Sequence, residues 1–330
     1  MPQNYSIEFS KRNSLRSNTI GMRATYGLTL LKIKEDLNDL CVFTADTSTS
    51  AGLERFRNNF PESFYDCGIS EQCMIASAAG YVAEGGIALA STFAPFLILR
   101  AAEQIRLSMG YMKLPLVITG LASGVALGYL GYTHCCVEDL PYILNIPNIY
   151  VYSPSDAYEL EQLLPKIIQL KKPTYIRLTG TSKIKPVHNQ NFQTDLSSPI
   201  QISNYGNEIL VLSTGSISSN AKEAVNIFNT KNPNKVSHYV VPFFCESTRE
   251  SLEKIMFNYK KILVLDEAMF GGLSSFCLKT FNKIGMIDKK ISFNCHPEFY
   301  LKCGSYEYML KQCKLDIEGI ADSIETLLIN

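Results

Sequence analysis

The side chains best suited to acid–base chemistry follow short apolar segments of this 330-residue chain. Asp46 comes directly after the apolar run 41–45, and Glu71 begins a second apolar stretch. His134 follows a glycine-rich segment further along. Read as part of a parallel sheet, the three side chains lie near strand ends, where such sheets bind ligands. They are therefore the first candidates for a functional site.

The sequence around Glu71 leaves two roles open for its carboxyl group. Ile69, Met74 and Ile75 surround it with apolar side chains. A carboxyl group at the start of such a helix is either a buried capping group or a carboxylic acid that keeps its proton for catalysis. The residue pattern favours neither role over the other.

Two aromatic rings and a histidine extend this candidate site. Phe93 and Phe96 stand in the run STFAPF, and such rings pack in a core more often than they hold a ligand. His134 precedes Cys135 and Cys136, which invites a metal site or a Cys–His nucleophile. Adjacent cysteines do not suit one tetrahedral site and no third ligand is in view, so we expect no metal ligands in this chain.

Alternating strand and helix patterns must position these residues. In the first half, the predicted strands are 41–45, 87–91, 116–119, 148–152 and 174–178, and the predicted helices are 22–35, 71–83, 96–109 and 157–170. In the second half, strands are predicted at 208–212, 236–241 and 261–266, and helices at 216–228, 252–258 and 273–281. Strands alternating with helices indicate parallel sheets covered on both faces. We therefore expect an α/β fold of two doubly wound domains with mainly parallel sheets.

The chain is too long for one ordinary core, which favours two domains. Residues 1–20 are predicted to be a loose N-terminal lead-in, and residues 21–182 the first domain. The polar, proline-containing stretch 183–203 is predicted to be a linker that leads into a second domain, 204–330.

Composition argues against several classes of function. Thirty-one basic residues balance thirty-one acidic ones, which speaks against nucleic-acid binding. The uncharged stretch 114–132 is long enough to span a bilayer, but its four glycines favour a buried strand entering a loop. The N-terminus lacks an apolar signal segment, and the ten cysteines form no CxxC pair. We expect no membrane association and a cytoplasmic location.

Several longer motifs stand in a distinctive order. The first group is ADTSTS (45–50), GISEQ (68–72), STFAPF (91–96), LGYTHCC (130–136) and YSPSD (152–156). The second group is EILVLSTGS (208–216), VLDEAMFGGL (264–273) and NCHPEFY (294–300). The first group resembles the pyrimidine-binding domain of the transketolase family, and the second is similar to the C-terminal domain of that family. The resemblance covers roughly residues 20–330.

This resemblance implies thiamine diphosphate as the cofactor and gives roles to the matching residues. Glu71 matches the family glutamate that hydrogen-bonds the aminopyrimidine ring, and Phe96 matches the ring that stacks on it. A carboxylic acid at that place stabilises the tautomer whose nitrogen takes the thiazolium proton, and apolar neighbours favour the protonated acid. His134 matches a histidine that contacts the substrate, so it joins Glu71 as a catalytic residue. The other expected cofactor contacts are Asp46, near the thiazolium, Ile69 and Phe93.

One part of the family's cofactor site is missing from the sequence. The family's other domain carries a Gly-Asp-Gly stretch that binds magnesium and the diphosphate, and this chain has none. The resemblance therefore implies the C-terminal half of a split transketolase. An N-terminal partner subunit would bind Mg²⁺ or Ca²⁺ and share the cofactor, most simply in an α2β2 heterotetramer.

Departures from the family pattern concern the substrate. Leu130 stands where transketolases carry an aspartate that recognises a sugar hydroxyl. Ala122 and Gly180 fall near a family histidine and arginine that help to bind sugar phosphate. Arg23 and Ser50 retain part of a phosphate site. With His134 and Leu130 they are the expected substrate contacts, and we expect a small sugar, modified or nucleotide-linked, instead of a common pentose phosphate.

Other readings remain open from the sequence. The beta subunit of a 2-oxo acid dehydrogenase shares the two-domain plan and the length. Deoxyxylulose-phosphate synthase is a further relative, but it is normally one full-length chain. A non-catalytic scaffold with the same fold is a third alternative, and the intact Glu71 argues against it.

Overall fold

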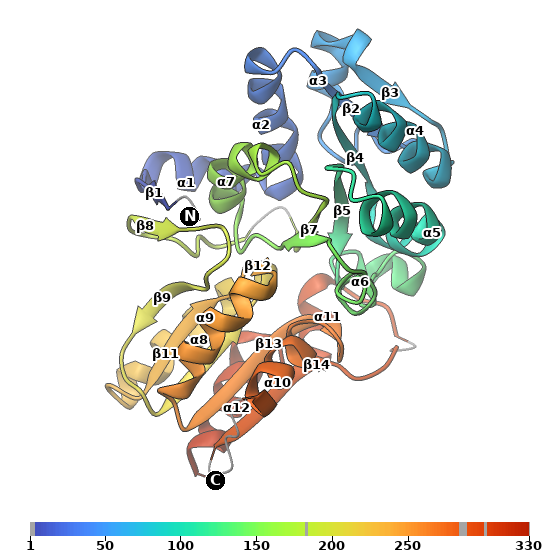
Figure 1. The fold of residues 1–330 in the computed structure, drawn as a ribbon. Coiled ribbons are helices and arrows are strands. Elements are labelled where there is room, and N and C mark those ends of the chain that lie inside the picture. Colours follow the sequence, from blue (N-terminus) through green and yellow to red (C-terminus); the bar gives the residue numbers. More distant parts are fainter. Residues whose placement is uncertain (1–3, 182–183, 284–288, 300–301, 330) are drawn as a thin grey trace.

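The structure is a computed structural model that describes residues 4–181, 184–283, 289–299 and 302–329. Two sheets with helices on their faces form an upper and a lower domain (Figure 1). A small sheet of two short strands lies beside them. The expected α/β fold with mainly parallel sheets is confirmed.

The first domain is built on a seven-stranded sheet in the order β12-β6-β7-β5-β4-β2-β3. All pairs in it are parallel except β12–β6. Its strands are β2 (Leu40–Thr44), β3 (Phe64–Asp66), β4 (Ile87–Phe93), β5 (Val117–Ser123), β6 (Tyr150–Tyr152), β7 (Thr174–Thr179) and β12 (Phe243–Phe244). β4 and β5 run through the middle of the sheet and are largely buried, as expected for a sheet that is covered on both faces.

Helices cover both faces of this sheet. They are α1 (Lys11–Ile20), α2 (Met22–Asp36), α3 (Glu54–Asn59), α4 (Glu71–Ala83), α5 (Ala102–Ile105), α6 (Asp139–Ile143) and α7 (Ala157–Gln169). α2 and α7 bury Tyr26, Leu30 and Leu160 on one face, and α4 buries Met74 and Ile75 on the other. These apolar stripes fix which face of each helix packs on the sheet.

The second domain has a five-stranded sheet in the order β14-β13-β10-β11-β9, in which only β9 is antiparallel. Its strands are β9 (Ile200–Asn204), β10 (Ile209–Ser213), β11 (Val236–Val240), β13 (Lys261–Met269) and β14 (Lys290–His296). Its helices are α8 (Ser218–Lys231), α9 (Glu246–Phe257), α10 (Leu273–Lys283), α11 (Tyr306–Gln312) and α12 (Ile317–Ile329).

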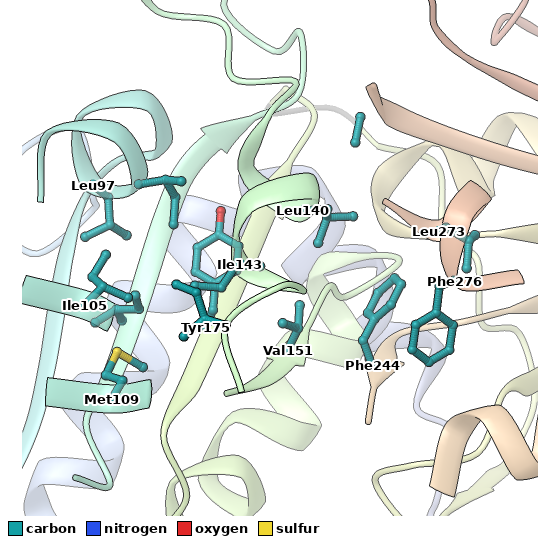
Figure 2. Packing of buried hydrophobic residues seen from close by; sticks show 14 of the residues in the cluster. Leu97, Ile105, Met109, Leu140, Ile143, Val151, Tyr175, Phe244, Leu273 and Phe276 are labelled. Carbon is teal, nitrogen blue, oxygen red and sulfur yellow. The ribbon is translucent and has the colours of Figure 1, made fainter. Parts of the chain in front are cut away.

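One hydrophobic core runs from the first domain into the second. Leu97, Ile105 and Tyr175 belong to the same cluster as Phe244 and Phe276 (Figure 2). β12, which precedes α9, pairs with β6 and so completes the first sheet with a strand from the second half of the chain. The two domains therefore share a continuous hydrophobic core.

The described parts of the segments expected to be a loose lead-in and a linker, residues 4–20 and 184–203, form regular structure and contact the first domain. β1 (Tyr5–Ile7) pairs with β8 (Phe192–Thr194), which makes the two-stranded sheet. Ser10 caps the start of α1, where its side chain accepts a hydrogen bond from the amide of Asn13, and the helix packs on α7. The lead-in is thus not loose, because its helix has α7 to pack against.

The uncharged stretch 114–132 forms the buried strand β5 and then a glycine-rich turn, as expected. Within the described residues, no helix has the length and hydrophobicity needed to cross a membrane.

Candidate active site

Glu71 is buried at the first turn of α4, with only 2% of its surface exposed. The preceding loop turns at Gly68, whose φ of +64° is a conformation that glycine adopts without strain. α4 is then fixed by the burial of Met74 and Ile75 beneath it. The sequence prediction of this helix, 71–83, agrees with the structure at both ends.

Three rings lie together close to the strand ends. Phe93 ends β4, Phe96 follows three residues later, and His134 comes from the turn after β5. The centroid of the His134 ring is 5.4 Å from that of Phe96 and 6.1 Å from that of Phe93, in edge-to-face geometry. The Nδ1 atom of His134 is 2.9 Å from the hydroxyl of Thr133. All three rings are half-buried, so each retains surface for a ligand.

Arg100 joins these rings to Glu71. Its Nη1 donates to both carboxylate oxygens of Glu71, at 2.9 and 2.7 Å. Its guanidinium carbon lies 4.6 Å from the centroid of the Phe96 ring. One planar cation therefore contacts a buried carboxylate and an aromatic face at the same time.

The backbone between 96 and 111 explains this arrangement. The helix expected over 96–109 is divided into a π-helix η2 (Phe96–Arg100), the short α5, and a second π-helix η3 (Arg106–Tyr111). A π-helix has a wider turn than an α-helix and is common at functional sites. Within η2, Arg100 follows Phe96 by four residues, about one turn, so the guanidinium can lie over the ring.

Asp66 ties two loops of the site together. Its Oδ1 accepts the amide of Asp46 at 2.8 Å and the amide of Gly68 at 3.0 Å. Asp46 itself has a φ of +55° and an exposed side chain. Ile69, in the same loop as Gly68, is 77% exposed, which leaves a large apolar side chain open to a ligand or a partner.

Arg23 and Ser50 lie together on a cavity of about 200 Å³. Arg23 Nη1 donates to the backbone carbonyl of Ser50 at 3.1 Å. Ala122 and Gly180 line the same cavity, so the two expected substrate contacts lie beside the two positions at which phosphate-binding side chains of the family are replaced. The other lining residues are Ile20, Gly21, Met22, Ala24, Thr49, Gly52, Leu178, Thr179 and Thr181.

Leu130 lies on the turn that carries His134. The turn η4 (Gly128–Thr133) leaves Leu130 43% exposed beside the 65% exposed Tyr129. The second domain supports this turn, since the amide of Gly304 donates to the carbonyl of Gly128 at 3.2 Å. The turn before His134 thus carries exposed apolar side chains and is supported by the C-terminal domain.

A buried ionic cluster lies where the segment that carries His134 leads into α6. Arg177, on β7, is fully buried, and its Nε donates to Asp139 at 2.7 Å while Nη1 lies 3.6 Å from Asp266. Burial raises the pKa of Asp266 and of Glu267. Burial opposes the charge of Arg177, but Asp139 and Asp266 outweigh it and raise the arginine pKa. The cluster joins the His134 loop to the second domain.

Replacing Arg177 with methionine should lower the free energy of unfolding by about 3–5 kcal/mol, because Asp139 and Asp266 would remain buried without their cation. The measurement is urea unfolding of the purified chain. Lys235→Met is a matched control at a surface pair with Glu208, and should cost less than about 1 kcal/mol. Equal stability of the Arg177 variant and the wild type would contradict the role given to this cluster.

The residues present fit the pyrimidine end of thiamine diphosphate. The guanidinium of Arg100 already shows that a planar, hydrogen-bonding group can contact the Glu71 carboxylate and the Phe96 ring together. For the diphosphate end, the described residues contain no group of three or more His, Cys, Asp or Glu side chains that could hold a metal ion.

Sequence reasoning missed Arg100, Asp66 and Arg177. Arg100 could have been noticed from its place four residues after Phe96 on one predicted helix. Arg177 is the only charged residue in the strand run TYIRLT, which signals a buried charge that needs partners. Asp66 carries no comparable signal, because its role depends on two loops that meet only in the fold.

Comparison with protein families identifies the first half of the chain. Residues 18–182 match the family model described as the pyrimidine binding domain of transketolase. A protein of Methanocaldococcus jannaschii assigned as a transketolase C-terminal section is 29% identical over 307 residues. That alignment covers 92% of this chain and 95% of the relative.

Two further similarities extend over nearly the whole chain. One of the subunits of the apulose-4-phosphate transketolase of Phocaeicola vulgatus is 25% identical over 317 residues, covering 93% of this chain and 97% of the relative. A solved split-gene transketolase, described as an inactive β4 tetramer, superposes with a TM-score of 0.81 at 24% identity. It covers 94% of this chain and 98% of the solved chain, and it shows that the folds agree.

Proposed function

Because this chain belongs to the transketolase family, and corresponds to the C-terminal subunit of split transketolases, we propose that it moves a two-carbon ketol unit from a ketose to an aldehyde together with an N-terminal subunit. Thiamine diphosphate, when bound, would supply the nucleophilic carbon for this transfer. The observation that carries the proposal is the buried carboxyl group of Glu71 beside the partly open rings of Phe96 and His134.

Each of these side chains has a part in the proposal. Glu71 binds the aminopyrimidine and holds a proton at its carboxyl group, a task that suits a side chain with little access to water. Phe96 orients the cofactor by stacking, with Phe93, Ile69 and Asp46 as further contacts. His134 contacts the oxygens of the substrate, and its Nδ1 is oriented by the hydroxyl of Thr133.

We propose that a partner subunit supplies the metal ion, Mg²⁺ or Ca²⁺, and the contacts to the diphosphate. The relative from Phocaeicola vulgatus is itself named as a subunit, and this chain spans nearly its full length. Large exposed apolar side chains support an assembly, most simply an α2β2 heterotetramer. They are Ile69, Leu99, Leu107, Tyr111 and Met112. We place this assembly in the cytoplasm, where the cysteines would stay reduced.

The proposed substrate is a small sugar with weak demands on phosphate binding. Arg23 is a cationic side chain on the cavity of about 200 Å³, while Ala122 and Gly180 add no hydrogen-bond donor from a side chain. Leu130 offers an apolar surface to the acceptor instead of a carboxylate. A modified or nucleotide-linked aldehyde suits such a site better than a common pentose phosphate.

We expect the assembled enzyme to use ribose 5-phosphate poorly, with kcat/KM below about 10⁴ M⁻¹s⁻¹, the lower end of the usual enzyme range. An apolar site leaves no unmet donor when a hydroxyl is absent, so deoxygenated or bulky aldehydes should be used better. Steady-state rates with a panel of phosphorylated, unphosphorylated and nucleotide-linked aldehydes would test this. Efficient use of ribose 5-phosphate would show that the partner subunit supplies the phosphate contacts.

The same assay tests the proposed function. Ketol transfer should require both subunits and thiamine diphosphate. Decarboxylation of a 2-oxo acid without ketol transfer would instead identify the chain as the beta subunit of a 2-oxo acid dehydrogenase.

A further inference from the structure

Arg100 occupies the place where the proposed function needs a cofactor. Its guanidinium bonds both oxygens of Glu71, at 2.9 and 2.7 Å, and lies 4.6 Å from the centroid of Phe96. The proposed function reserves the same two groups for the aminopyrimidine, which must accept or donate a hydrogen bond at Glu71 and stack on Phe96. Arg100 and the cofactor therefore compete for one carboxyl group.

The charge of Arg100 strengthens its contact with Glu71. A guanidinium attracts a carboxylate more strongly where water is excluded. Glu71 is 2% exposed, so little water screens this pair from its buried side. The proposed role of Glu71 requires the same carboxyl oxygens that Arg100 contacts, so the guanidinium must leave before the cofactor can bind there.

The side chain of Arg100 can rotate into solvent, whereas that of Glu71 is held in the interior. The side chain of Arg100 is 45% exposed, and that of Glu71 only 2%. Rotation of Arg100 toward solvent would thus break one ion pair while keeping its charge solvated.

We propose that Arg100 is a positioning residue that holds the Glu71 carboxylate in the subunit without cofactor and swings away when the cofactor binds. This inference rests on the proposed function. In the unloaded subunit, Arg100 spares Glu71 from being a buried charge without a partner. In the loaded assembly, the aminopyrimidine takes over that task and Arg100 faces solvent.

Thermal unfolding of Arg100→Met tests the first half of this proposal. In the chain alone, the variant should melt several degrees below the wild type, because Glu71 loses the contact that pairs its charge. In the assembly loaded with thiamine diphosphate and Mg²⁺, the difference should disappear. A purely structural arginine would lower the melting temperature equally in both states, and that result would overturn the proposal.

Cofactor affinity tests the second half. Suppose that Arg100 contacts Glu71 and Phe96 about nine-tenths of the time. Its removal should then tighten thiamine diphosphate binding by roughly tenfold, since the fraction of molecules able to bind the cofactor rises from about one-tenth to one. Calorimetric titration of the assembly with thiamine diphosphate and Mg²⁺ measures this. Equal or weaker binding by Arg100→Met would overturn the inference and show that the arginine stays to support the site.

A matched control separates this effect from a general loss of charge. Arg106→Met removes an exposed arginine further along the same segment, which pairs with Glu103 at 3.8 Å, and should bind the cofactor as the wild type does. A tenfold gain in this variant too would assign the effect to charge alone and overturn the inference. Absence of binding by the wild-type assembly would instead reject the proposed function, so the two failures are distinguishable.

Discussion

Replacing Glu71 with glutamine should lower the turnover of the assembled enzyme by about 10²–10⁴-fold, the usual range for the loss of a general acid–base group. The amide of glutamine can still form a hydrogen bond, but it cannot hold and release the proton of a carboxylic acid. The side chain is nearly isosteric, and α4 is fixed by Met74 and Ile75 beneath it. The assembly should therefore remain folded.

Proton exchange at the reactive carbon of the bound cofactor is the most direct readout for this variant, because it does not depend on the sugar. NMR should show slower exchange in Glu71→Gln than in the wild type. Glu103→Gln is a suitable control, since Glu103 is exposed on the neighbouring helix. Wild-type exchange in Glu71→Gln would remove this residue from the catalytic role.

Periodic patterns in the sequence predicted the elements that hold the site. The helix at 71–83 was predicted with its observed bounds, and 157–170 differs from α7 by one residue. Both helices bury an apolar stripe and begin next to a residue suited to a helix start, Glu71 or Asp156. Local sequence is sufficient to predict a helix where the helical spacing of apolar residues, the residue at the helix start and the buried face all agree.

Other elements depend on contacts that no local pattern contains. β12 has only two residues, and it becomes a strand because β6 offers it an edge. α1 lies in a polar segment and forms against α7. The apolar spacing at 96–109 indicated one helix, but the π-helical turns η2 and η3 interrupt it. For β12 and α1, the partner comes from a distant part of the chain.

In the candidate site, too, some residues were predicted from sequence motifs and others depend on contacts between distant parts of the chain. Motif order led to Glu71, Phe96 and His134, and the structure brings Phe96 and His134 to 5.4 Å. The pairing of Glu71 with Arg100 was not predicted, because no basic residue stands near the glutamate in the sequence. The place of Arg100 one turn after Phe96 is visible in the sequence, but its contact with the buried carboxylate of Glu71 is visible only in three dimensions.

The second large effect concerns assembly. The chain alone should bind thiamine diphosphate at least about a hundredfold more weakly than the assembly, because the diphosphate needs a metal ion with oxygen ligands. The described residues offer no cluster of such ligands, while Glu71 and Phe96 contact only the pyrimidine end in the proposed complex. Activity should likewise be absent from the chain alone and should return when the partner is added.

Calorimetric titration of thiamine diphosphate and Mg²⁺ into this chain, with and without its N-terminal partner, tests the shared site most directly. The account predicts tight, magnesium-dependent binding only for the mixture, with the chain alone giving weak binding or none. Tight, magnesium-dependent binding by the chain alone would contradict the proposal that two subunits complete one cofactor site.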